Sequence, residues 1–249
     1  MEPERVRGIV LQATPVGEYD RRLVLLTKEY GKIAAFAKGA RRPHCALVAC
    51  SQPFSFGTFH IYRGRTSNSI NGADISNYFE ELKKDMTGTC YGLYFCEMSD
   101  YFTRENSDAT DILNLLYITL RALEKKIVPP DLIRQIFELK MLTLNGEAPQ
   151  VFECVKCGEK EDKGTRFSFH HDGLLCAKCE SEFGHNTDQQ LSEAALYTLQ
   201  YIIASPLKEL YGFNVTPKVL TEVKQFMKNY KGKHLTYKFN SEEYLEGFL

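Results

Sequence analysis

Residues 22–37, RLVLLTKEYGKIAAFA, contain the pattern on which the predicted fold depends. Two mainly apolar runs, Arg22–Thr27 and Lys32–Ala37, flank the short connection Lys28–Gly31, which ends in glycine. Apolar runs joined by a short connection that contains glycine are typical of a β-hairpin. The stretch therefore predicts a pair of antiparallel strands.

Further short β-rich segments lie on both sides of this hairpin. Val6–Ala13 precedes it, and Phe54–Arg63 and Ser69–Ile75 follow it. Alternation in the fourth segment puts five residues on one face: Phe54, Phe56, Thr58, His60 and Tyr62. Five short strands within residues 1–75 predict a small barrel of the size of an OB-fold, and a small SH3-like barrel fits nearly as well.

From residue 79 onward the apolar residues recur with the period of an α-helix. One stripe consists of Ile112, Leu115, Leu116, Leu120 and Leu123. A second helix is expected to begin after Pro129-Pro130-Asp131 and to stop at Asn145-Gly146. Two more are expected, one ended by Ser205-Pro206 and one running from Thr216-Pro217 to Gly232.

These patterns predict an α+β protein with two domains. Residues 1–78 form an OB-fold-like β-barrel, and residues 79–249 form an all-helical domain. A zinc-binding insertion at 150–185 interrupts the helical domain.

Two CxxC pairs carry the clearest chemistry in the chain. Cys154 and Cys157 form the first, and Cys176 and Cys179 form the second after an interval of 18 residues. Four thiolates at this spacing are typical of a tetrahedral Zn²⁺ site. Because protein would fill all four positions, the predicted zinc is structural rather than catalytic. Free or redox-active thiols are the alternative.

The segment between the pairs predicts how they meet. Arg166–Phe169 and Leu174–Leu175 flank a turn at Asp172-Gly173, which predicts a hairpin that swings the second pair back to the first. His170 and His171 are interpreted as hairpin residues, since four cysteines already complete the ligand set. The remaining cysteines show no disulfide framework: Cys45, Cys50, Cys90 and Cys96.

The net charge of −1 conceals an uneven distribution. Residues 1–75 contain 11 lysines and arginines against 6 acids, whereas the remainder is net acidic. A basic barrel suggests an anionic partner. Lys38 to Arg42 and Arg21-Arg22 are candidate phosphate contacts, and barrel aromatics are candidates for stacking on bases. A solvated charged surface is the alternative.

Several classes of function are disfavoured. No apolar run is long enough to span a membrane, and the N-terminus has no apolar segment of a signal peptide, so a cytoplasmic protein is expected. P-loop, GxGxxG and HExxH motifs are lacking. Gly88-Thr89-Cys90-Tyr91-Gly92 has the form of a nucleophile elbow, but a charged, helix-like stretch precedes it, so a helix-packing face is preferred. No enzymatic activity is expected.

Longer stretches of the chain resemble the bacterial recombination and repair mediator family RecO. The resemblance covers nearly the whole chain in order, at Gly8–Leu11, Glu18–Leu23, Leu26–Ile33, Ala37–Arg42, Arg134–Leu142, Gly146, Pro149, Cys154–Gly158, Phe167 and Gly173–Cys179. Two places depart from the family pattern. Pro43-His44-Cys45 replaces a Lys-Ser that often follows the two arginines, and residues 233–249 match only loosely.

The resemblance implies an OB-fold, a helical domain and a zinc segment, together with a role in the RecF pathway of repair. It implies binding and annealing of single- and double-stranded DNA, and loading of recombinase with RecR onto DNA coated by single-strand-binding protein. The resemblance also implies that the protein is associated with the nucleoid and is not an enzyme. A protein-binding adaptor without direct DNA contact is the alternative.

Two sets of site residues complete this hypothesis. The expected DNA-binding residues are Arg21, Arg22, Lys32, Lys38, Arg41 and Arg42. The acidic-apolar tail of single-strand-binding protein is expected in an apolar pocket rimmed by Arg121, Arg134 and Lys140. Internal ion pairs are the alternative role for Arg134 and Lys140.

Overall fold

The structure, a computed structural model, describes residues 2–160 and 166–248. The chain divides into two compact units, Met1–Lys126 with Phe239–Leu249, and Ile127–Lys238. The C-terminal helix therefore belongs to the same unit as the N-terminal strands. Among the described residues, no helix has both the length and the apolar character that crossing a membrane demands.

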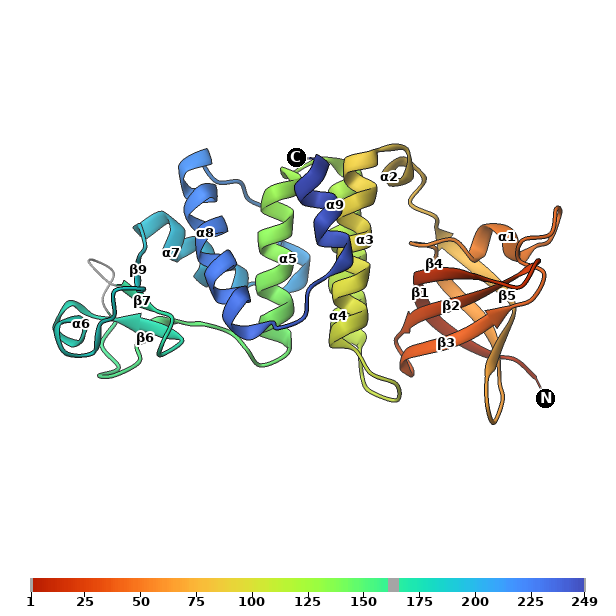
Figure 1. Cartoon of the computed structure of the whole chain (residues 1–249), viewed down its shortest axis with the longest axis horizontal. Coiled ribbons are helices and arrows are strands. Elements are labelled where there is room, and N and C mark those ends of the chain that lie inside the picture. The colour runs from red at the N-terminus through yellow and green to blue at the C-terminus, as the bar shows by residue number, and fades with distance from the viewer. Residues whose placement is uncertain (1, 161–165, 249) are drawn as a thin grey trace. The chain divides into compact units, whose positions relative to one another are not determined.

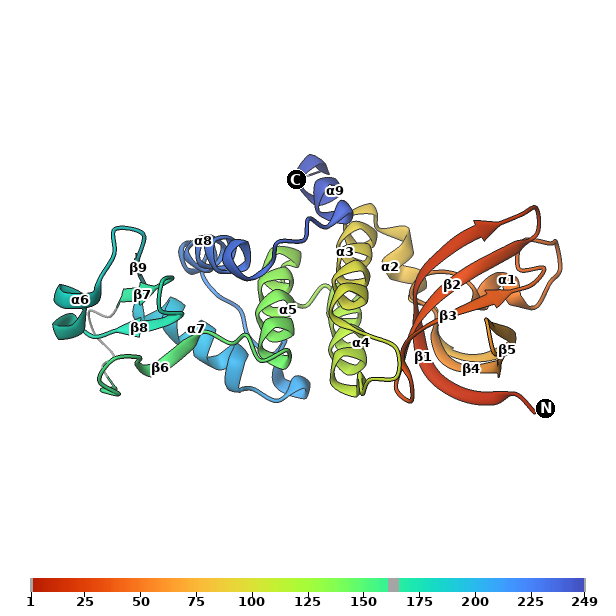
Figure 2. The same ribbon diagram turned by 60° about the horizontal axis from the view of Figure 1, so that its bottom comes forward.

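The first unit begins with a closed five-stranded barrel (Figures 1 and 2). Its strands are β1 (Glu4–Val16), β2 (Asp20–Thr27), β3 (Gly31–Ala37), β4 (Phe56–Arg63) and β5 (Asn68–Asn77), in the order β1-β2-β3-β5-β4. The short helix α1 (Leu47–Cys50) lies between β3 and β4, and a parallel pairing of β3 with β5 closes the barrel. This topology confirms the OB-fold rather than the SH3-like alternative.

Aliphatic and aromatic side chains fill the barrel. Val10, Leu23, Leu25, Phe59 and Ile61 are among its fully buried residues. The inward face of β4 is thus the one that carries Phe59 and Ile61. Phe56 lies on the opposite face of β4, which is the face that the alternation in the sequence marks. Its ring is buried against Tyr117, with 4.4 Å between the ring centroids.

Helices complete the first unit: α2 (Glu80–Lys84), α3 (Met86–Phe102), α4 (Thr110–Lys125) and α9 (Asn240–Phe248). The apolar stripe predicted around Leu115 and Leu116 faces the core of this unit. Residues 88–92 lie within α3, which confirms a helix there instead of a nucleophile elbow. A Cβ at Gly92 would come within 3.0 Å of the Phe54 ring, so this glycine permits close packing.

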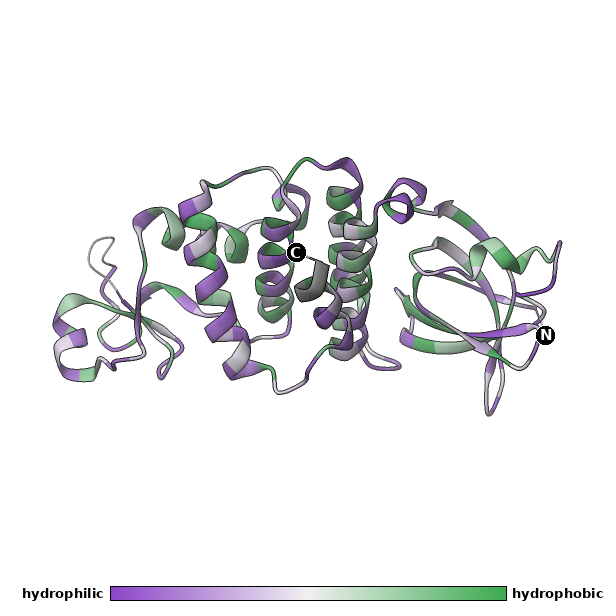
Figure 3. Cartoon of the chain, turned by 45° about the horizontal axis from the view of Figure 1, so that its top comes forward, coloured by the Kyte–Doolittle hydropathy of each residue, from purple (hydrophilic) through white to green (hydrophobic). Residues whose placement is uncertain are grey.

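The second unit contains α5 (Pro130–Leu144), α7 (Glu193–Ala204), the 3-10 turn η1 (Leu207–Glu209) and α8 (Pro217–His234). Each helix shows hydrophobic residues beside hydrophilic ones, as expected for elements with one buried face (Figure 3). Ser192 and Thr216 cap α7 and α8 by accepting hydrogen bonds from backbone N–H groups. The predicted stop at Gly232 is wrong, because α8 continues to His234.

A small mixed sheet lies between α5 and α7 along the chain. It consists of β6 (Gln150–Cys154), β7 (Arg166–Ser168), β8 (Gly173–Leu175) and β9 (Gln189–Gln190), in the order β6-β8-β7-β9, and α6 (Ala177–Phe183) follows β8. The antiparallel pairing of β7 with β8 confirms the predicted hairpin. The four cysteines lie on and beside this sheet: Cys154 ends β6, Cys157 is in the turn that follows it, Cys176 follows β8 and Cys179 lies in α6.

Candidate metal centre and nucleic-acid interface

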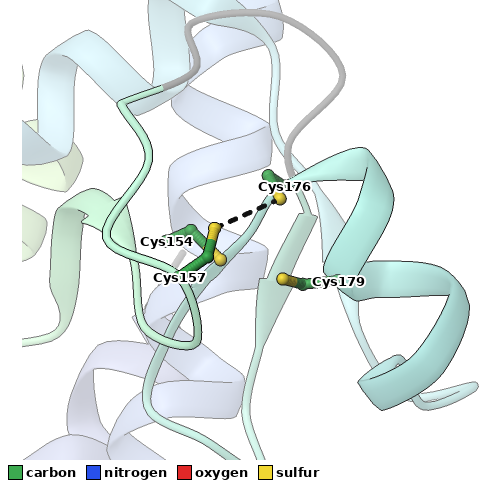
Figure 4. A group of neighbouring side chains, drawn as sticks. All are labelled: Cys154, Cys157, Cys176 and Cys179. Atoms are coloured by element: carbon green, nitrogen blue, oxygen red, sulfur yellow. Dashed lines mark hydrogen bonds between the residues drawn. The ribbon is translucent and has the colours of Figure 1, made fainter.

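The four predicted cysteines converge on one point (Figure 4). Their Sγ atoms all lie within 4.8 Å of one another, and those of Cys157 and Cys176 are 3.7 Å apart. Four sulfurs around a zinc ion at about 2.3 Å each form a tetrahedron with edges of roughly 3.8 Å. The distances between the sulfurs therefore fit a metal ion bound by four thiolates.

Local backbone geometry brings the two pairs together. Gly158 takes a positive φ of 74°, and its N–H donates to the carbonyl of Cys154 at 2.8 Å, which closes a tight turn around the first pair. The N–H of Val155 donates to the carbonyl of Leu174, which holds this turn against β8. Cys176 then follows β8 directly and begins α6.

The electrostatics of the cluster favours ionisation of one thiol. Burial opposes the charge on Cys154, but N–H groups of Cys176, Cys157 and Lys156 point at its sulfur and lower its pKa to about 6. Burial and the neighbouring thiols raise the pKa of Cys179 to about 12. A metal ion supplies the positive charge that four adjacent thiolates need. The four cysteines can therefore hold a metal ion.

Apolar packing around this centre is sparse. Cys154, Leu175 and Cys176 form its buried core, with Val155, Cys179 and Phe183 packed against it. Half of these residues are the cysteines themselves. Cysteines thus contribute as many members to this cluster as apolar side chains do.

Another group of ligand-type side chains lies in the same segment. Ring nitrogens of His170, His171 and His185 also lie within 4.8 Å of one another. His170 and His171 occupy the turn between β7 and β8, as the hairpin interpretation requires. Sequence reasoning missed their approach to His185, because only the pairing of β7 with β9 brings the two loops together.

Two of the six cations predicted to bind DNA are partly buried and engaged within the first unit. A guanidinium nitrogen of Arg21 donates to Ser51 Oγ at 2.8 Å and lies 3.4 Å from the carbonyl of Val48. The ammonium of Lys32 donates to the carbonyl of Asp100 at 2.8 Å and pairs with its carboxylate. These two residues brace the barrel against α1 and α3.

The other four cations are exposed: Arg22, Lys38, Arg41 and Arg42. Arg22 lies at the start of β2, and the remainder occupy the segment after β3. Within residues 2–160 and 166–248, the side chains of Arg22 and Lys38 make no hydrogen bond or ion pair.

Backbone N–H groups of the loop after β3 donate hydrogen bonds to the loop between β1 and β2. The N–H of Arg41 donates to the carbonyl of Tyr19 at 2.8 Å, and the N–H of Gly39 donates to Asp20 at 2.7 Å. The guanidinium of Arg42 lies over the Tyr19 ring, 4.7 Å from its centroid. Tyr19 was not predicted as a site residue. Its only signal in the sequence is an aromatic residue in a polar loop beside the arginines.

The three residues predicted to rim a peptide pocket are not brought together within either unit. Arg121 lies in the first unit, where it pairs with Glu124 on α4. Arg134 and Lys140 lie on α5 in the second unit, and the guanidinium of Arg134 pairs with the buried Glu138 at 2.8 Å.

Lys140 has an internal role. Its side chain is buried, with 6% of the residue exposed, and its ammonium donates to the carbonyls of Ile202, Ile203 and Ser205. It therefore caps the C-terminus of α7, where a positive charge is favourable. Burial lowers the pKa of this ammonium. Arg134 thus forms the kind of internal ion pair that was its alternative role, whereas the Lys140 ammonium is bound by backbone carbonyls instead.

An apolar groove lies elsewhere in the second unit, between α7 and the start of α8. Its volume is about 390 Å³, and its lining residues include Tyr197, Tyr201, Phe213, Val215 and Val219. The Tyr197 side chain is prominent, with 67% of the residue exposed. The Tyr201 and Phe213 rings pack edge to face at 4.9 Å.

Fold and site together define an OB-barrel protein with exposed cations and a four-cysteine centre that can hold a metal ion. Two family models match the chain, "Recombination protein O N terminal" over residues 1–79 and "Recombination protein O C terminal" over residues 83–243. The chain therefore belongs to the Recombination protein O, or RecO, family.

Full-length relatives agree with this assignment. A DNA repair protein RecO of Alkaliphilus metalliredigens is 32% identical over 243 residues, which cover 96% of this chain and 97% of the relative. A protein of the same name from Acetivibrio thermocellus is 31% identical over 97% of this chain and 96% of the relative. The family supports a role in DNA repair and recombination.

Proposed function

We propose that this protein is a non-enzymatic mediator of DNA repair and recombination in the RecF pathway. It binds single- and double-stranded DNA and anneals complementary strands. With RecR, it helps to load recombinase onto DNA coated by single-strand-binding protein. Membership in the RecO family supports this proposal, and so does the OB topology, which is widely used for binding nucleic acids. We expect it to act on the nucleoid in the cytoplasm.

The observation that carries direct DNA contact is the set of exposed cations Arg22, Lys38, Arg41 and Arg42. Hydrogen bonds between the Gly17–Asp20 and Gly39–Arg42 loops fix the backbone that presents three of them. The Arg41 guanidinium also donates to the carbonyl of Gly17, at 3.2 Å, and remains exposed. Cations that neutralise phosphates release counterions, so binding weakens as salt rises. Arg42 and Tyr19 together offer a flat, charged and aromatic surface on which a base can stack.

A salt titration of DNA binding tests this surface. The variant carries Arg22→Ala, Lys38→Ala, Arg41→Ala and Arg42→Ala. Each phosphate contact contributes about 0.7 to the logarithmic salt slope on single strands, so we expect the slope to fall by roughly 3 units. Fluorescence anisotropy with labelled oligonucleotides at several salt concentrations measures it.

A matched control removes exposed lysines from the second unit: Lys208→Ala, Lys218→Ala and Lys228→Ala. This variant should retain the wild-type salt slope. An unchanged slope in the barrel variant would remove the proposed surface. If the wild-type chain alone bound no DNA, the adaptor alternative would replace direct contact.

We also propose that the ion held by the four cysteines is structural Zn²⁺. Soft thiolate ligands in a closed tetrahedral set are typical of zinc. The distance of 3.7 Å between the sulfurs of Cys157 and Cys176 suits such a set. A site closed by four sulfurs leaves no position for substrate or water, which supports a role in folding.

The tail of single-strand-binding protein remains a proposed partner of the helical part. Of the predicted rim residues, only Arg121 has a substantially exposed side chain. The groove beside Tyr197 offers the apolar surface that such a tail needs. These two features lie in different units and are tested separately.

Binding of a synthetic tail peptide to Arg121→Glu and to Tyr197→Ala separates these two positions. We expect charge reversal at Arg121 to weaken binding if its cation meets the acidic residues. Loss of the Tyr197 ring should weaken binding if the groove holds the apolar end. Lys84→Glu, an exposed charge reversal on α2, is the control. Binding unaffected by both changes would refute both placements.

A further inference from the structure

The histidines of the zinc-ribbon segment form a group separate from the cysteine centre. His170 and His171 come from the turn after β7, and His185 comes from the loop between α6 and β9 (Figure 1). Their ring centroids are 4.7 Å apart for His170 with His171 and for His170 with His185. Three imidazoles from two loops therefore face one small volume.

The loops that carry these histidines are held in place by several contacts. Strand pairing joins Phe167 to Gln189, and the guanidinium of Arg166 donates to the carbonyl of Asp188 at 2.8 Å. The N–H of His185 donates to Asp188 Oδ2 at 2.8 Å. The approach of His185 to the hairpin turn is thus fixed by the backbone on both sides.

Protein contacts alone do not explain why the imidazoles gather. In the described ranges 2–160 and 166–248, none of the three rings makes a hydrogen bond or ion pair. Each neutral imidazole retains a nitrogen lone pair, and protonation of all three would bring like charges together. A shared cation that accepts lone pairs from all three rings satisfies this arrangement.

A buried carboxylate oxygen provides a second observation. Asp188 is 5% exposed, and its Oδ1 has no hydrogen-bond partner among the described residues. Its other oxygen accepts from the N–H of His185, which places the carboxylate beside the cluster. Histidines that bind metal ions are commonly supported by a nearby carboxylate.

We propose that His170, His171 and His185 form a second metal site, which takes a divalent transition-metal ion such as Zn²⁺ or Ni²⁺. Imidazole nitrogens without thiolates suit this class of ion. Three protein ligands leave a coordination position open, in contrast to the closed cysteine centre. His170 and His185 are exposed, so metal at this site can exchange with solvent.

The proposed histidine site is independent of the proposed DNA function. Small side-chain rotations bring the nitrogens closer, because metal–nitrogen bonds of about 2.1 Å require ligand separations of roughly 3.4 Å. The exposed rings have room for such rotations. The site therefore assembles around the ion without a change in the strands.

Nickel binding by the full-length, zinc-loaded protein tests the site. Isothermal titration with Ni²⁺ should show one equivalent bound, while metal analysis shows that the cysteine centre keeps its zinc. The absorption of bound nickel should lack thiolate charge-transfer bands. A variant with His170→Gln, His171→Gln and His185→Gln should take up no nickel and keep its zinc. His44→Gln, an exposed histidine on the barrel, should behave as wild type.

A single variant keeps the test decisive if the triple variant loses its zinc. His185→Gln should weaken nickel binding by at least about tenfold, since even supporting residues of metal sites change affinity by this much. No nickel uptake by the wild type, thiolate charge-transfer bands from bound nickel, or uptake unchanged in His185→Gln would each overturn the proposal.

Discussion

Arg21 and Arg22 are adjacent in sequence but have different surroundings in the barrel. The Arg21 guanidinium is bound to Ser51 and the end of α1, whereas Arg22 is exposed. Successive residues of a strand point to opposite faces, so one arginine turns toward the protein and the next toward solvent. We therefore expect the second rather than the first to meet a phosphate.

This difference predicts opposite effects of the same substitution. Arg21→Ala should lower the free energy of unfolding by about 1–2 kcal/mol, because it leaves buried acceptors on α1 unpaired. It should leave the salt slope of DNA binding unchanged. Arg22→Ala should change stability by less than about 0.5 kcal/mol and flatten the slope. Denaturant unfolding and salt titration of both variants check this. A flatter slope in Arg21→Ala would contradict the assignment.

At the scale of elements, α8 shows how tertiary contacts extend a helix. Judged from the local sequence alone, Gly232 favours the end of the helix. In the structure Lys233 and His234 continue the helix and reach the hairpin turn. The ammonium of Lys233 lies 2.7 Å from Asp172, and the His234 ring lies 3.0 Å from the same carboxylate. The last turn of α8 is thereby tied to the hairpin of the cysteine segment.

This link predicts an acid-sensitive contribution to stability. Burial opposes the charge of Asp172, but Lys233 and His234 outweigh it and hold its pKa below the ordinary value. A lowered carboxyl pKa contributes stability above the unfolded value near 4, and this is lost as pH falls further. The contribution is small, about 0.5–1 kcal/mol, because the groups are partly exposed.

Asp172→Asn should therefore be less stable than wild type at pH 6, and the two should converge toward pH 3. The metal centre is acid-sensitive in both proteins, so the difference between their unfolding curves is the measurement. Lys178→Met removes an exposed cation of the same segment and serves as the control. A difference that stays constant with pH would exclude the ion pairs as its source.

At the scale of the whole molecule, the two units differ in what stabilises them. The barrel has a large apolar core built from all five strands. Around the four cysteines of the second unit the buried cluster is small, and half of its members are cysteines, although the hairpin also packs Phe167 against Phe226 of α8. Metal binding and folding are expected to be coupled in that segment and independent in the barrel.

Removal of the metal should therefore unfold one region selectively. After treatment with a strong chelator, or in Cys176→Ser, amide exchange should rise in strands β6–β9 and in α6, and remain slow in strands β1–β5. DNA binding through the barrel should persist. Cys45→Ser, outside the centre, should leave exchange in the cysteine segment slow. Loss of protection throughout the barrel would contradict independent stability.

The sequence by itself determined the barrel, the main helices and the four cysteines, because each depends on local periodicity, turn residues or ligand spacing. It did not determine which cations are exposed. Arg21, Lys32 and Lys140 find partners far along the chain, at Ser51, Asp100 and Ser205, and no local pattern marks such contacts. Likewise, the approach of His185 to the hairpin turn was decided only by tertiary structure, since strand pairing joins segments that the sequence keeps apart.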